Sequence, residues 1–201
     1  MDAFTRALKI SILLSILAIA VGCSEVNAPT ASLQSDDAVS STQYPPLDNI
    51  IANLEAAGYR AVNPPVQSRL DDHECDSIIV ERYARVNQGG SVNLQGLVRL
   101  EWEPGVIPDN MTLQIVAPSN CIGAADFYPH PTSFNGYVRI IWDVTALELP
   151  EDFNFDSLVP LYIHDDGTPE EVIYSWRGNH NELVVETNHF SRYIISTRIG
   201  Y

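Results

Sequence analysis

The chain has 201 residues, with 11 basic against 26 acidic side chains and a net charge of −15. Lys9 is its only lysine, so arginine supplies almost all of the positive charge. This balance argues against nucleic acid as a partner, because phosphates are bound by basic patches. It argues equally against docking of a folded domain on anionic lipid. The length suits one domain with a real core plus a tail.

The first residues have the pattern of an export signal. Arg6 and Lys9 flank the start of an apolar run over residues 10–21, which is too short to span a bilayer as a helix. The run ends in Ala20-Val21-Gly22-Cys23, which resembles the lipobox of bacterial lipoproteins. The resemblance implies that residues 1–22 are a signal peptide cut before Cys23. An ordinary cleaved signal and an uncleaved anchor are the alternatives.

The same resemblance implies where the protein resides. Cys23 is expected to carry acyl chains such as palmitate, because a thiolate is a good nucleophile for lipid transfer. The chain is then exported and anchored to the cell envelope, and the membrane is its partner through the lipid on Cys23. Ser24 is similar to the residue that follows the cysteine in lipoproteins of the outer membrane, if the source has two membranes.

Two further cysteines, Cys75 and Cys121, are disulfide candidates. Exported proteins meet oxidising conditions, so a disulfide bond between these two cysteines is one expectation. Spacing alone does not show that the two residues meet. Two separate buried thiols are the alternative.

Residues 23–46 are rich in Ser, Thr, Ala, Asp and Pro and predict a flexible tether. Residues 47–76 predict a short helix and a linker. The helix is indicated by apolar residues at helical spacing, with Asp48 or Asn49 as its cap and Gly58 at its end. The acidic run over residues 71–76 contains metal-ligand residue types, but no second cluster accompanies it. A solvated turn is the favoured interpretation of that run.

Residues 77–200 predict a β-domain. Period-two patterns indicate strands near residues 78–86, 91–94, 97–102, 111–116, 137–144, 161–163, 172–176, 183–186 and 193–198. Gly89-Gly90 predicts a turn through its permissive φ, and residues 145–157 a loop with one helical turn. Because little helix separates the strands, the fold class is all-β, an antiparallel β-sandwich. The last two strands are predicted to fold about His189-Phe190-Ser191.

The order of these signals resembles the zonula-occludens/uncoordinated-type β-sandwich, the ZU-like domain, in the version found on bacterial surface lipoproteins. The residues that carry the resemblance are Gly89-Gly90, the Pro104–Pro108 loop, Phe127-Tyr128-Pro129-His130 and the ending His189-Phe190-Ser191-Arg192-Tyr193. It covers about residues 77–196. It implies a sandwich fold and an interaction role, and it names no specific partner.

His189-Phe190-Ser191 is the one tripeptide with a sharp chemical interpretation. In some animal members of the resembled family the same tripeptide marks self-cleavage. Ser191 would attack the Phe190 carbonyl to give an ester, with His189 as the base, and water would hydrolyse that ester. The favoured alternative is structural: Phe190 fills the core, Ser191 caps the turn, and His189 packs on the surface.

Other candidate sites are weaker. Glu148, Glu151 and Asp152 have the residue types of a glycosidase pair but suit a solvated loop better. His164-Asp165-Asp166-Gly167 lacks the ligand number of a calcium loop and predicts a hairpin turn. We take His130 as structural. Tyr128, Tyr162 and Tyr174 have the chemistry of a carbohydrate platform, although tyrosines on strands usually pack.

The sequence therefore predicts a non-enzymatic, lipid-anchored envelope protein whose β-sandwich is an interaction or structural module, with an envelope protein as its possible partner. Self-cleavage between Phe190 and Ser191 is the first alternative, and carbohydrate binding is a remoter one. No cofactor and no metal are predicted, and the sequence sets no oligomeric state.

Overall fold

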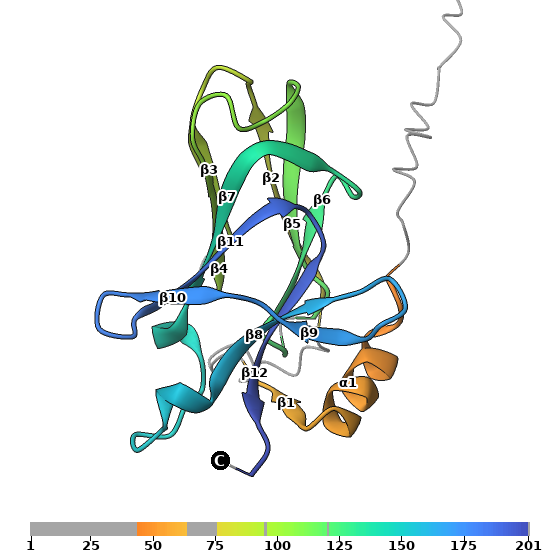
Figure 1. The fold of residues 1–201 in the computed structure, drawn as a ribbon, viewed down its shortest axis with the longest axis vertical. Helices are drawn as coiled ribbons and strands as arrows, with labels where there is room; N and C mark the ends of the chain where they lie inside the picture. Colours follow the sequence, from red (N-terminus) through yellow and green to blue (C-terminus); the bar gives the residue numbers. More distant parts are fainter. Residues whose placement is uncertain (1–43, 64–75, 95, 120, 201) are drawn as a thin grey trace, which may run out of the picture. The chain divides into compact units, whose positions relative to one another are not determined.

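The computed structural model describes residues 44–63, 76–94, 96–119 and 121–200. Within these residues the chain forms two antiparallel sheets that pack face to face and one α-helix (Figure 1). The prediction of an all-β antiparallel sandwich is confirmed. The predicted signal peptide, Cys23, most of the tether, Cys75 and the acidic run up to residue 75 lie outside the described residues.

The first sheet, sheet A, has seven strands in the order β2-β5-β6-β12-β8-β9, and β1 also pairs with β12. The strand bounds are β1 Tyr59–Ala61, β2 Ile78–Ala84, β5 Met111–Ala117, β6 Ala124–Tyr128, β8 Leu158–Ile163, β9 Pro169–Glu171 and β12 Arg192–Arg198. The last strand of the chain therefore lies in the interior of the sheet, between β6 and β8.

The second sheet, sheet B, has five strands in the order β10-β11-β7-β4-β3. Its bounds are β3 Gly90–Leu94, β4 Val98–Trp102, β7 Ser133–Asp143, β10 Tyr174–Arg177 and β11 Glu182–His189. Two short 3₁₀ turns, η2 Val144–Ala146 and η3 Phe155–Ser157, lie in the connection between β7 and β8. They correspond to the predicted loop with a helical turn.

The core lies between the sheets and follows the period of two. On β4, Val98, Leu100 and Trp102 are buried, as predicted, while the residues between them are half-buried. Large side chains from both sheets fill the centre, among them Phe127, Trp142, Phe190 and Tyr193. Burial of apolar area at about 25 cal/mol per Å² is the main force that holds such layers together.

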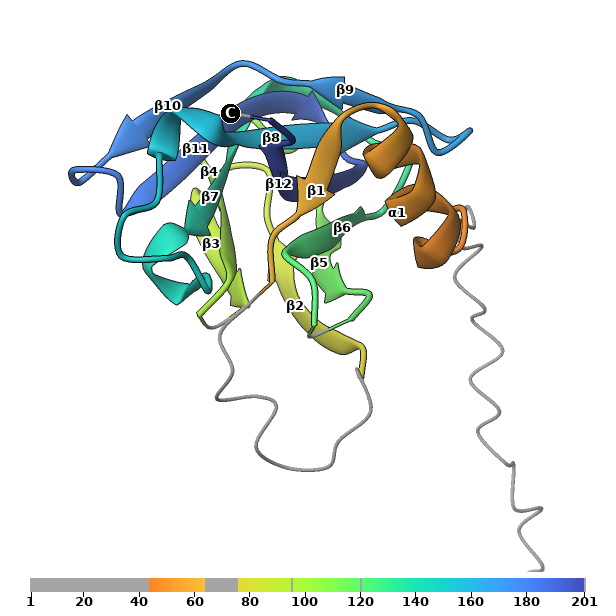
Figure 2. The ribbon, with the colours of Figure 1, turned by 90° about the horizontal axis from the view of Figure 1, so that it is seen from below.

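Helix α1, Leu47–Ala56, covers the outer face of sheet A. Its two fully buried residues, Ile50 and Leu54, pack on residues of β6, β8 and β12 in a second apolar cluster. Figure 2 shows the helix beside this end of the sheet. The helix ends before Gly58, which has a φ of +87°. Pro46 holds the N-cap position without a side-chain hydrogen bond, so the expected cap by Asp48 or Asn49 is wrong.

The predicted hairpin about His189-Phe190-Ser191 is also wrong. Both strands exist, but β11 belongs to sheet B and β12 to sheet A, so the tripeptide is a corner where the chain crosses between the layers. Alternation of apolar residues indicates two strands. It does not indicate whether they pair with each other or with strands elsewhere in the chain.

Three strands were not predicted, β1, β6 and β9. Strand β6 lacks polar alternation because both of its faces are buried, and Asp126 is buried along with its alanines. Strand β1 has three residues and pairs with β12, so it is part of the sandwich rather than of a linker. Tyr44 is buried as well. The folded part therefore includes residue 44, earlier than the predicted domain start at 77.

Gly89-Gly90 has a different role from the predicted one. Neither residue has a positive φ, and Gly90 begins β3. A Cβ on Gly90 would lie 2.7 Å from Cζ2 of Trp102. The absence of a side chain lets the indole pack on the backbone of β3, so close approach rather than turn geometry requires this glycine.

We expect Leu54→Ala to lower the free energy of unfolding by about 2–5 kcal/mol, because it leaves a cavity between α1 and sheet A. Glu55→Ala, on the exposed side of the same helix, is the control and should change stability by less than about 0.5 kcal/mol. Denaturant unfolding measures both. Equal stability of the two variants would mean that α1 is not an integral part of the domain.

Candidate functional site

The corner between β11 and β12 is fixed by the burial of Phe190. Its ring is fully buried and packs edge-on against Phe134, with centroids 4.6 Å apart, and near Phe127 at 5.8 Å. Its backbone N–H donates to the carbonyl of Thr132 at 3.1 Å. Phe190 thus fills the core, as the structural interpretation of the tripeptide proposes.

Ser191 is also fully buried, and its hydroxyl donates to the carbonyl of Ile163 on β8 at 3.2 Å. The Ser191 carbonyl accepts from the N–H of Phe127 on β6 at 3.1 Å. The residue therefore joins the start of β12 to its neighbours on both sides. The expected turn cap is wrong, because the hydroxyl bonds across the sheet rather than within the corner.

His189 is half-buried, and its ring contacts its own strand and Tyr162 on β8 rather than Ser191. Nδ1 lies 3.2 Å from Asn188 Oδ1 and 3.4 Å from Thr187 Oγ1, and the ring stands edge-on to Tyr162. Burial, with a smaller contribution from His130, lowers the pKa of His189 below its usual value. The imidazole does not form a base–nucleophile pair with the Ser191 hydroxyl, which donates to the Ile163 carbonyl.

A second histidine, His130, contacts the carbonyl that self-cleavage would attack. Its Nδ1 lies 2.6 Å from the Phe190 oxygen. The bonds from Tyr128 to Pro129 and from His130 to Pro131 are both cis. The Pro129-His130-Pro131 pattern marks His130 as a rigidly placed residue. The pattern does not identify the residue it contacts, Phe190, which follows sixty residues later.

Thr187 completes the corner by joining the two sheets. Its hydroxyl accepts from the Tyr193 hydroxyl at 3.0 Å and donates to the His189 carbonyl at 3.0 Å. Burial raises the pKa of Tyr193 to about 12. The corner is thus a set of satisfied, buried hydrogen bonds around an aromatic plug, an arrangement that rigidifies a fold.

We expect the peptide bond between Phe190 and Ser191 to stay intact, because the Ser191 hydroxyl is committed to Ile163. Mass spectrometry of the purified chain after long incubation should give one mass, and Ser191→Ala should give the same pattern. A fragment that begins at Ser191 in the wild type and disappears in the variant would contradict this expectation.

A buried ion pair lies next to the corner, on the outer face of sheet A. Arg192 on β12 binds Asp126 on β6 through two hydrogen bonds, with Nη2 and Oδ2 2.7 Å apart. Burial raises the pKa of the Asp126 carboxyl, against the hydrogen bonds from Arg192. The guanidinium also donates to the Pro45 carbonyl at 3.1 Å and lies 4.8 Å from the centroid of the Tyr44 ring. The segment that precedes α1 is thereby tied to β12.

We expect Arg192→Met alone to destabilise the fold by about 3–5 kcal/mol, because it leaves a buried carboxylate without its partner. The double variant Asp126→Leu with Arg192→Met should recover most of that loss, since a hydrophobic pair needs no compensation. Chemical denaturation of the two single variants and the double variant measures the coupling. Simple additivity of the single effects would show that the pair does not act as a unit.

Beside the corner lies a groove of about 510 Å³. Its walls come from β9 on one side and the second half of β11 on the other, and we call it the β9–β11 groove. Side chains that line it include Tyr137, Tyr162, Glu170, Ile173, Glu186 and His189. Tyr137 is 64% exposed and Ile173 is 93% exposed, so the groove has an apolar rim open to solvent.

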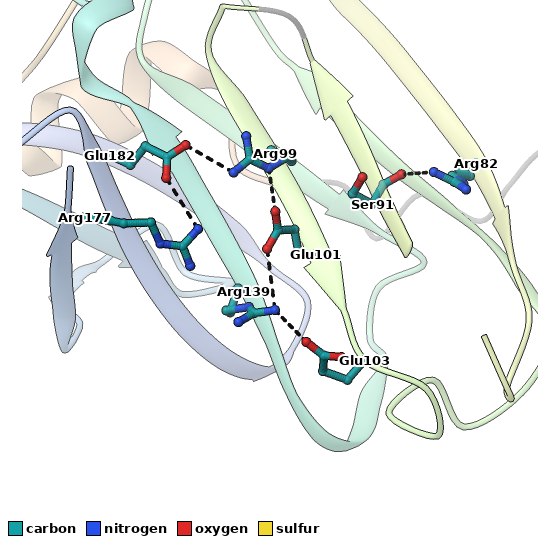
Figure 3. A network of polar contacts seen from close by, with 8 residues as sticks. All are labelled: Arg82, Ser91, Arg99, Glu101, Glu103, Arg139, Arg177 and Glu182. Atoms are coloured by element: carbon teal, nitrogen blue, oxygen red, sulfur yellow. Dashed lines mark hydrogen bonds and ion pairs between the residues drawn. The ribbon is translucent and has the colours of Figure 1, made fainter. Parts of the chain in front are cut away.

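The groove differs in charge pairing from the outer face of sheet B. On that face arginines and glutamates alternate in a chain of ion pairs that crosses β10, β11, β4 and β7 (Figure 3). Arg99 bridges Glu101 at 2.8 Å and Glu182 at 3.1 Å, and Arg139 lies 2.7 Å from Glu103. These charges satisfy one another. The groove is lined by three glutamates, and its lining contains neither lysine nor arginine.

The three tyrosines considered for sugar binding do not form a platform. Tyr128 stands edge-on to Tyr44, Tyr162 packs against Tyr193, and the Tyr174 hydroxyl donates to the Leu158 carbonyl at 3.1 Å. They lie on β6, β8 and β10 and are all half-buried. Of the three, only Tyr162 lines the groove.

The remaining candidate sites are turns and loops. Asp166 accepts from the N–H and hydroxyl of Thr168, and the Gly167 N–H donates to the His164 carbonyl at 2.8 Å, as in the predicted turn. Glu148, Glu151 and Asp152 are exposed in the loop after η2. Across the residues that the structure describes, no group of three or more His, Cys, Asp or Glu side chains could hold a metal ion.

Cys121 is disulfide-bonded. Cys75 and Cys23 lie outside the described residues, so the pairing of Cys121 with Cys75 stays a prediction, as does lipidation of Cys23. Within the described part of the chain, no helix has the length and apolar character needed to cross a membrane.

Comparison of the chain with protein-family models gives no match, and a search of curated proteins gives none either.

Proposed function

We propose that this protein is a non-enzymatic, lipid-anchored module of the cell envelope that binds a partner through the β9–β11 groove. The groove itself carries the proposal. It is an open concavity, and concave sites with an apolar lining and a few polar groups are the usual places of binding. The lipid on Cys23 would hold this module at the membrane.

The architecture is consistent with a ZU-like sandwich, which we propose on the pattern of turns and strands quoted above. Sandwiches carry many unrelated functions, so the groove rather than the fold supports the binding role. The corner supports a structural role for His189-Phe190-Ser191, because its polar groups already bond to one another and to β6 and β8.

A photo-crosslinking amino acid placed at residue 173 or 137, on the rim of the groove, tests the proposal in cells that make the full chain. We expect one envelope protein, identified by mass spectrometry, to be captured from both positions. The control positions are Tyr83 and Ile199, which are exposed and do not line the groove. Equal capture from all four positions, or none from the rim, would contradict a role for the groove.

A further inference from the structure

We propose that the β9–β11 groove receives an extended basic peptide segment, which adds as a strand to the free edge of β11. This inference rests on the proposed function and specifies the chemistry of its partner. Three features of the described residues carry it: an unpaired strand edge, the charge of the lining, and the apolar rim.

The edge of β11 is free over its second half. Strand β10 pairs with residues 182–185 of β11, where Tyr174 lies opposite Val185. Strand β11 continues to His189, and on its other side it remains paired with β7. Glu186 to His189 therefore have no strand partner on the β10 side in the described structure, and all four line the groove. The N–H and the carbonyl of His189 already bond to the Thr187 hydroxyl, so residues 186–188 form the free edge. Backbone groups that point to such an edge can bond to an added strand.

The charge of the lining selects the kind of peptide. Glu170 on β9 and Glu186 on β11 are exposed and lie on opposite walls. Glu171 contributes less, because it is bound by Arg198 with Nη2 and Oε2 2.7 Å apart. Glu170 is paired with His164, which also lines the groove, with Oε2 and Nε2 2.8 Å apart. Among the described residues Glu186 forms no ion pair, and its carboxylate, in a lining without lysine or arginine, favours a lysine or arginine side chain.

The negative charge of the groove excludes two candidate occupants, the tether of this chain and a second copy of the protein. The tether, residues 24–43, has no lysine or arginine and carries Glu25, Asp36 and Asp37. A second copy of the protein would bring another net charge of −15. Both would meet like charge in the groove, so the occupant is a basic segment of a different protein.

The apolar rim suits the alternation of an added strand. Successive side chains of a strand point to opposite faces, so one set would lie on the face that carries both Glu186 and Tyr137, which the register of β11 with β7 places on the same side of sheet B. The rings of Tyr137 and Tyr162 also favour a cation near their faces. Strand addition therefore uses the backbone for affinity and the lining side chains for specificity.

The test measures binding of synthetic peptides of about eight residues to the purified full chain by fluorescence anisotropy. The first peptide alternates valine with lysine, the second replaces each lysine with glutamate, and the third carries N-methyl groups along the edge that would donate to β11. We expect only the first to bind well. Equal binding of the acidic peptide would overturn the charge argument, and equal binding of the N-methylated peptide would overturn strand addition.

Variants locate the site. Glu170→Gln with Glu186→Gln should weaken binding of the basic peptide by roughly tenfold, about threefold for each exposed charge pair. Glu151→Gln with Asp152→Asn makes the same charge change on an exposed loop outside the groove and should leave binding unchanged. Equal loss in both double variants would show a response to net charge alone and would overturn the site.

The results of the peptide test and the crosslinking test distinguish a failure of this proposal from a failure of the proposed function. If crosslinks from the rim persist while the basic peptide does not bind, the partner class is wrong and the binding role stands. If a neutral glycan displaces the basic peptide from the groove, the groove is a sugar site and the peptide proposal is overturned. If neither crosslinks nor peptide binding occur, both proposals are wrong.

Discussion

The insertion of β12 between β6 and β8 is the constraint on which the rest of the structure depends. Without that strand, sheet A would consist of three separate pieces, β2-β5-β6, β8-β9 and β1, because β12 alone joins them. The buried pair of Asp126 and Arg192 fixes the join on one side, and the hydrogen bond from Ser191 to Ile163 fixes it on the other. The join needs residues that are distant in sequence, so the chain must close long loops before this sheet is complete.

The corner at Phe190 follows from the same constraint. The chain must leave sheet B after His189 and enter the interior of sheet A at Arg192, and the aromatic plug between Phe127 and Phe134 fixes the path. The segment before α1 is tied to this point too, because Arg192 binds the Pro45 carbonyl and lies against the Tyr44 ring.

The surface separates into paired and unpaired charge. On the outer face of sheet B, arginines neutralise the glutamates beside them (Figure 3). The β9–β11 groove forms where β10 ends and β11 continues, so it combines an open strand edge with the carboxylate of Glu186, which forms no ion pair within the described residues.

The sequence by itself determined the class of fold, most of the strands and helix α1, because alternation and helical spacing depend on which side of each element meets the core. It also singled out Phe190 as a core residue. Only the tertiary structure decided that β11 and β12 belong to different sheets, that His130 rather than His189 contacts the Phe190 carbonyl, and that Gly90 makes room for Trp102. Strand β6 was not predicted, because Asp126 interrupts its apolar residues. This carboxylate is buried through its ion pair with Arg192, sixty-six residues later. Local patterns record burial, whereas the choice of strand partners and the position of a groove depend on contacts between distant segments, which no local period encodes.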